Sequence, residues 1–322
     1  MIGRPGNWFF ILPWIAFIPW YGMLITMLIC WAAQGHPIYW FMHEYQFPVY
    51  ISDVGATNLR PLFISCAGWQ GLGYVLSVAS EYFQRSGRWP GFLRKNHDYT
   101  REEYHQTILD QKFLMPPYYT KHERNLIFAA VVIGGLGEVA LLMCTIFSTA
   151  LYHHVHLSMV GVFVVLMFFS ICCQVAQYWM MGRQYALFHP LSKSTRNSTE
   201  GLKWYQIDGY KYNKFIISAI CKVLWLVGAV VWAICFAAIK DNSKSSCFEW
   251  LLAFWFGVLF MIISCDFYLG GRYMHSKYFH QIEQINGFYK YDENSTECSD
   301  SNMEVVSTEE KLDDARSEMS SH

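Results

Sequence analysis

The sequence predicts an all-α protein that crosses a membrane six times and ends in a polar tail. Hydrophobic residues make up 53% of the 322-residue chain and charged residues only 15%, whereas an average soluble domain has about 25% charged residues. Six apolar stretches approach the ~20 residues that a helix needs to cross the hydrocarbon core of a bilayer. The formal net charge of −1 gives no indication of a nucleic-acid partner.

The length and apolar content of each stretch place the six predicted transmembrane helices. They lie at about 8–33, 62–80, 126–151, 157–181, 215–239 and 250–269. The first is too long for a signal-peptide core of roughly 7–15 residues, so we expect it to remain in the mature protein. The short links 152–156 and 240–247 predict that the helices they join are antiparallel neighbours. Residues 1–280 then form one transmembrane domain.

Lysine and arginine are distributed unequally between the two ends of the predicted helices. Twenty of them fall in the N-terminal segment, in loops 84–124 and 182–214, and in the C-terminal region. The other side has only three: Arg60, Lys240 and Lys244. The positive-inside rule therefore places both termini in the cytoplasm. The sequons at Asn197 and Asn294 fall on the cytoplasmic side, so we expect neither to carry a glycan.

The polar stretch 48–61, between the first two predicted helices, must fold over the non-cytoplasmic surface of the membrane. Its Asp, Gly and Asn residues favour turns. Thr57 or Asn58 can cap a helix whose first turn contains Pro61. Asp53 would lie near the N-terminus of that helix, where a carboxylate is favoured. The stretch is either a capped loop that orients two helices or a lid and binding surface.

Charged residues inside the predicted helices form a second candidate site. Glu138 lies in the middle of the third helix, and Glu81 lies at the inner end of the second. Lys222 and Asp266 differ in depth by about one helical turn, or ~5 Å. An isolated charge at the bilayer centre costs roughly 3 kcal/mol or more, so we expect these two residues to pair. The charges form either a structural ion pair or a polar pocket for a lipid head group or a proton.

The loop after the second predicted helix, QRSGRWPGFLRK, interleaves basic residues with Trp89 and Phe92. Such a segment attracts anionic lipid head groups by about 1 kcal/mol per charge near the surface. Ordinary positive-inside charge explains the same residues equally well. The candidate lipid head-group contacts are Arg85, Arg88, Arg94 and Lys95.

Residues 281–322 differ in composition from the rest of the chain. From position 291 onward, ten acidic residues stand against one lysine and one arginine, with many serines and few apolar side chains. Such a composition cannot bury a core, so we expect a disordered acidic cytoplasmic tail. Ser301 and Ser307 each precede a glutamate by three residues, which makes them candidate phosphorylation sites. The tail is either a regulatory arm or a solubilising segment.

The cysteines and histidines do not form a recognisable site. Most of the ten cysteines lie inside apolar runs, where cysteine behaves as a small hydrophobic residue. His153, His154 and His156 cluster on the non-cytoplasmic side, but their spacing matches no known zinc site. The glycine-rich run 134–137 suits close helix packing rather than nucleotide binding. We therefore predict no metal, no cofactor and no catalytic centre.

The stretch PVYISDVGATNLRPLFISCAGWQG, between two helices of a six-span protein with cytoplasmic termini, resembles the FRAG/DRAM/Sfk family. Together with WFFILPWIAF and MLITMLICWAAQGHPIYW, it is most similar to the fungal suppressor-of-four-kinase branch. The resemblance covers about residues 5–280 and excludes the acidic tail. The family loop motif corresponds here to Ile51, Ser52, Asp53, Gly55, Asn58 and Pro61.

The resemblance implies a plasma-membrane protein without a catalytic centre. Such a protein helps to recruit or activate a phosphatidylinositol 4-kinase complex, supports phosphoinositide levels and keeps phospholipids asymmetric across the bilayer. The implied partners are that kinase complex, anionic phospholipids and phosphoinositides. Two alternatives stay open: an enzyme or enzyme subunit of glycosylphosphatidylinositol-lipid remodelling, and a small transporter or lipid scramblase. The sequence has no internal repeat that would favour an inverted-repeat transporter.

Overall fold

Six long helices form the described part of the protein. The computed structural model describes residues 6–275, except 43, 87–112, 197–198 and 200. Within these residues the helices long and apolar enough to cross a membrane are α1 (Leu12–Ala33), α3 (Arg60–Ser86), α5 (Lys121–Ile146), α6 (Thr149–Phe188), α7 (Lys214–Ala238) and α8 (Asn242–Gly271). The predicted all-α, six-span fold is confirmed. The acidic region 281–322 lies outside the described residues.

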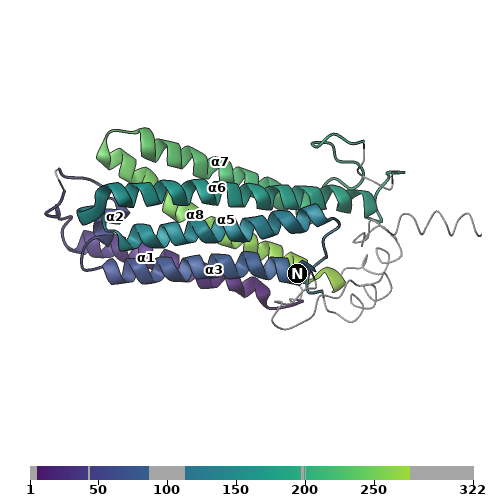
Figure 1. Cartoon of the computed structure of the whole chain (residues 1–322), viewed down its shortest axis with the longest axis horizontal. Helices are drawn as coiled ribbons and strands as arrows, with labels where there is room; N and C mark the ends of the chain where they lie inside the picture. The colour runs from purple at the N-terminus through teal and green to yellow at the C-terminus, as the bar shows by residue number, and fades with distance from the viewer. Residues whose placement is uncertain (1–5, 43, 87–112, 197–198, 200, 276–322) are drawn as a thin grey trace, which may run out of the picture.

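Successive long helices run in opposite directions along one bundle (Figure 1). A short helix, α2 (Ile51–Gly55), lies at one end of the bundle. Two 3-10 turns, η1 (Phe9–Ile11) and η2 (Tyr273–His275), lie near the opposite end. We call these the α2 end and the η2 end. The basic residues that were assigned to the non-cytoplasmic side all belong to the α2 end: Arg60, Lys240 and Lys244.

The helices joined by the two short links are antiparallel neighbours, as predicted, but the predicted bounds of both links were wrong, because each link is largely helical. Residues 152–156 lie inside α6, which begins almost directly after α5. The link 240–247 is mostly the first part of α8, where the Asp241 side chain accepts a hydrogen bond from the backbone N–H of Lys244 (3.1 Å). Hydropathy detects only the apolar part of a helix, whereas caps of this kind determine where the helix begins.

Glycines allow α3, α5 and α6 to approach closely. A Cβ on Gly134 would lie 2.6 Å from the Tyr74 ring and 2.7 Å from Ser170 Oγ. A Cβ on Gly73 would lie 2.7 Å from the backbone nitrogen of Ala16 in α1. Neighbouring helices approach this closely only where the residue has no side chain. The close packing predicted for the run 134–137 is therefore confirmed at Gly134.

Candidate functional site

The predicted pair of Lys222 and Asp266 is present in the structure. Lys222 Nζ lies 2.5 Å from Asp266 Oδ2 and donates a second hydrogen bond to Ser218 Oγ (2.9 Å), which in turn donates to Asp266 (2.8 Å). The ammonium group also lies 3.3 Å from the centroid of the Tyr178 ring, within the range of a cation–π contact. The buried charge of α7 is thus held by α6 and α8 together.

Arg85 is buried inside the bundle, so the structure contradicts its prediction as a lipid head-group contact. Its side chain is 1% exposed, and Nε lies 2.8 Å from Glu81 Oε1, one turn earlier in α3. The guanidinium also donates to the Pro116 carbonyl (2.9 Å) and to the Tyr178 hydroxyl (3.3 Å). A buried carboxylate at i−4 draws the arginine inward, because an unpaired charge there would be costly. Three other predicted contacts lie outside the described residues: Arg88, Arg94 and Lys95.

Uncharged side chains add to these charges in two separate hydrogen-bonded groups, which we together call the polar network. Gln177 Nε2 donates to Glu81 Oε1 (3.1 Å). Gln174 Nε2 donates to the Tyr74 hydroxyl (2.9 Å), which lies 2.8 Å from Ser170 Oγ. Sequence reasoning missed these residues, although glutamines inside an apolar run are a signal in themselves. The network joins α3 to α6, and through Tyr178 it reaches the Lys222 pair.

Glu138 lies at the far end of this region, deep in α5. Its Oε1 accepts a hydrogen bond from Gln70 Nε2 (2.9 Å), and Oε2 has no hydrogen-bond partner among the described residues. The described part of the chain also gives Glu138 no ion pair. Among the described residues, the carboxyl group therefore has a single hydrogen-bond donor.

The segment before α2 is fastened to the start of α8. The backbone N–H of Ile51, the first residue of α2, donates to Glu249 Oε2 (2.6 Å). One residue further along α8, Trp250 Nε1 donates to the Val49 carbonyl (2.7 Å). Because the N-cap residue of α2 makes no side-chain cap, Glu249 supplies the acceptor that the helix start requires.

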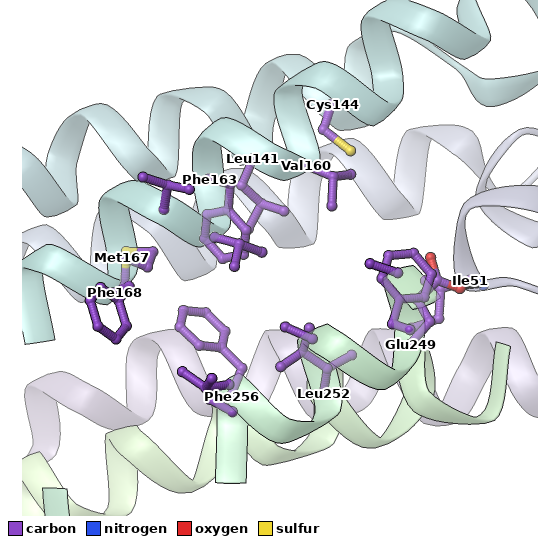
Figure 2. A pocket seen from close by; sticks show the side chains of 18 of the residues that line it. Ile51, Leu141, Cys144, Val160, Phe163, Met167, Phe168, Glu249, Leu252 and Phe256 are labelled. Atoms are coloured by element: carbon purple, nitrogen blue, oxygen red, sulfur yellow. Dashed lines mark hydrogen bonds between the residues drawn. The ribbon is translucent and has the colours of Figure 1, made fainter. Parts of the chain in front are cut away.

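A large apolar cavity of about 600 Å³ lies beneath α2. Figure 2 shows Phe163 and Leu252 on opposite walls of this space, with Ile51 and Glu249 at one end and Phe168 at the other. The walls come mainly from α6, α7 and α8. They include none of the charged members of the polar network, so the cavity and the network are separate features.

The polar lining of the cavity is concentrated at its α2 end, where Ser52, His156 and Glu249 lie. His156 is buried, and its Nδ1 lies 2.9 Å from the Cys144 carbonyl, to which it donates. His153, by contrast, is exposed and its Nδ1 contacts the hydroxyl of a neighbouring threonine. Among the described residues, no group of three or more His, Cys, Asp or Glu side chains could hold a metal ion.

A family model decides the relationship of this chain to known proteins. The Frag1/DRAM/Sfk1/Cwh43P N-terminal domain matches residues 8–270. The chain belongs to this family. Protein SFK1 of Saccharomyces cerevisiae is 61% identical over 327 residues, which cover 95% of this chain and 93% of that protein. Protein sfk1 of Schizosaccharomyces pombe is 24% identical over 268 residues, or 82% of this chain and 66% of that protein. No solved structure matches the chain.

Most of the residues predicted to form the family loop motif lie in α2, which covers the polar end of the cavity. Ile51 and Ser52 line the cavity. Gly55 is buried against the Phe63 ring, which a Cβ at this position would overlap. Two motif residues are exposed and lie outside the cavity: Asn58 and Pro61.

Asp53 is the acidic residue of the predicted motif. It lies in the first turn of α2, and its side chain is buried. Burial raises the pKa of its carboxyl group to about 6, because removal from water disfavours the charged form. The Asp53 carboxyl group therefore takes up a proton at a higher pH than an exposed aspartate does.

An exposed surface that was not predicted from the sequence lies at the η2 end. We call Lys203, Trp204 and Tyr205 the aromatic patch, because the two exposed rings contact each other and the lysine lies over the Tyr205 ring. Arg183 of α6 anchors this segment by donating to the Gln206 carbonyl (3.0 Å). Exposed Trp and Tyr beside basic residues are typical of the membrane–water interface. The signal was the same basic–aromatic mixture that drew attention to the loop after the second helix.

Proposed function

We propose that this membrane protein is a non-enzymatic regulator that recruits or activates a phosphatidylinositol 4-kinase complex at the cytoplasmic side of the plasma membrane. In this role it supports phosphoinositide levels and the asymmetry of phospholipids across the bilayer. The observation that carries the proposal is its 61% identity to Protein SFK1 over 95% of the chain. It agrees with the resemblance of the ISDVGATNLRP stretch to the suppressor-of-four-kinase branch.

The arrangement of charges supports a binding role. Lys222 and Arg85 each have a carboxylate partner and further donors or acceptors. Satisfied buried pairs of this kind are expected of side chains that hold helices together. The aromatic patch, by contrast, presents exposed rings and a lysine at the end that the positive-inside rule assigns to the cytoplasm. It is therefore the described surface at which we expect a peripheral complex and the inner leaflet to meet the protein.

The test measures phosphatidylinositol 4-phosphate at the plasma membrane with a fluorescent lipid probe. Cells without the protein should lose much of the probe signal, and full-length protein should restore it. Lys203→Glu combined with Trp204→Ala should restore it poorly, whereas Lys244→Glu, at the α2 end, should restore it fully. An unchanged signal on deletion, with the protein in internal membranes, would instead favour the lipid-remodelling alternative. Lipid flipping in reconstituted vesicles would favour the scramblase alternative.

A further inference from the structure

The cavity beneath α2 opens toward the lipid that surrounds the bundle. Some of its lining residues are also among the exposed residues of α6 and α7: Val165 is 53% exposed and Ile234 is 60% exposed. Both lie within helices that are long and apolar enough to cross a membrane. A molecule in the bilayer could therefore enter the cavity sideways, between α6 and α7, without passing through water.

The cavity walls suit a hydrocarbon chain. On α7, Ala229, Ala233 and Ala237 recur every four residues and all line the cavity, because side chains at this spacing share one face of a helix. Small side chains on this face leave the space that larger ones would fill. The volume of about 600 Å³ is within the usual range of ligand sites, roughly 300–1,000 Å³.

The α2 end of the cavity is acidic. Glu249 and Ser52 line it, and neither Lys nor Arg does. Asp53 lies next to Ser52 and is buried in the same short helix. Arg60, at this end of the bundle, donates instead to the carbonyl of Ile146 at the end of α5 (2.6 Å). A carboxyl group that is buried without a basic partner is stabilised in its charged form when a cation binds beside it, and it gains nothing from the additional phosphate of a phosphoinositide, so an amine-bearing head group fits better.

We propose that the cavity binds an acyl chain of an amine-bearing phospholipid, such as phosphatidylethanolamine, from the leaflet on the α2 side. The chain lies between α6, α7 and α8, and the ammonium group lies beside Glu249 and Ser52. This inference is independent of the proposed role in kinase recruitment, since the cavity and the aromatic patch are at opposite ends of the bundle.

Photocrosslinking tests the acyl-chain site directly. Full-length protein is reconstituted in phosphatidylcholine vesicles that contain phosphatidylethanolamine with a diazirine on its acyl chain. Ala233→Trp should reduce crosslinking at least tenfold, since the indole fills the cavity. Val227→Trp is the matched control, because Val227 also lies on α7, is 56% exposed and does not line the cavity. Crosslinked peptides of the unmodified chain should map to the walls, including Phe168 and Leu252.

Further variants separate loss of binding from loss of folding. The melting temperature of Ala233→Trp is measured first, and if the protein unfolds, the smaller Ala229→Phe replaces it. Glu249→Gln retains an oxygen that can accept from Ile51 N–H, so α2 should stay in place. This variant should lose the preference for phosphatidylethanolamine over an otherwise identical phosphatidylinositol probe. Equal capture of the two probes by the unmodified protein would overturn the proposal. Equal crosslinking of the Ala233→Trp and Val227→Trp variants would also overturn it. A photoactivatable sterol is tested in the same vesicles, and its capture in place of the phospholipid would overturn the proposal as well.

Discussion

At the scale of single residues, Lys222 illustrates how a charge is accommodated inside an apolar bundle. Its ammonium group has three donors, and it contacts Asp266, Ser218 and the Tyr178 ring. Burial of an ion costs several kcal/mol, which attraction repays only when the remaining donors also have partners. The surroundings of Lys222 meet that condition, so the interaction depends on both members of the ion pair.

We predict that Lys222→Met destabilises the protein by about 3–5 kcal/mol, because Asp266 is left buried and unpaired. Unfolding in detergent with increasing denaturant measures this change. The matched variant combines Lys222→Met with Asp266→Leu, removes both charges, and should recover most of the lost stability. If Lys222→Met alone is as stable as the unmodified protein, the ion pair does not hold the helices together.

Charged residues of the polar network could be predicted from the sequence, whereas their surroundings could not. Lys222 and Asp266 stand out because a charge in an apolar run is rare. Gln174 and Gln177 carry no charge, and nothing in their spacing states which helix they face. Arg85 was assigned to the loop because α3 continues beyond its apolar stretch to Ser86. The direction of a side chain at a helix end depends on tertiary contacts that a single sequence does not contain.

At the scale of helices, small residues have two different roles. Gly134 lies at a contact where α3 and α6 come close to α5. Gly161, in α6, has no atom within 4 Å of a Cβ placed on it. The sequence alone presents both as glycines in apolar helices, and only the structure distinguishes a contact glycine from an exposed one.

We predict opposite outcomes for the same substitution at these two glycines. Gly134→Ala should lower the free energy of unfolding by about 1–3 kcal/mol, since the new methyl group overlaps Tyr74 and Ser170. Gly161→Ala should leave stability unchanged or raise it by up to about 1 kcal/mol, because alanine is the better helix former. Thermal unfolding of the two variants under identical conditions tests the difference. Equal effects would refute the assignment of Gly134 to a tight contact.

The sequence predicts the presence of the six long helices more accurately than the residues at which they begin and end. Apolar runs reveal the six helices because the bilayer demands a minimum length. The start of α5 instead depends on Glu123, whose carboxylate accepts hydrogen bonds from the backbone N–H groups of Tyr119 and Thr120 (2.7 and 3.3 Å). A glutamate three residues after a threonine is a known start signal, but it lies outside the apolar run that defined the prediction.

At the scale of the whole molecule, the two ends of the bundle differ in charge. Arg60, Lys240 and Lys244 are the basic residues at the α2 end, and many more belong to segments of the η2 end. This difference would place the η2 end, with the aromatic patch, in the cytoplasm. The cavity and family motif would then face the opposite side of the membrane.

Glycan mapping tests this orientation. Trp40→Asn combined with Met42→Thr creates an acceptor in the α1–α2 segment, where Trp40 is exposed. We expect this variant to gain a glycan that a glycosidase removes, whereas Asn197 and Asn294 remain unmodified. The contrary pattern, with glycan on either natural sequon, would reverse the topology and place the aromatic patch outside the cytoplasm.

The attachment of the α2 segment to α8 also determines when the protein can be completed during synthesis. Val49 and Tyr50 bond to Trp250 and Asn242, partners that are 201 and 192 positions away. At about 5–20 residues per second, the ribosome needs roughly 10–40 s after the α2 segment to synthesise these partners in α8. Until then the Val49 carbonyl and the Tyr50 hydroxyl lack their final partners. A chain that stops before α8 would leave both groups permanently without these partners.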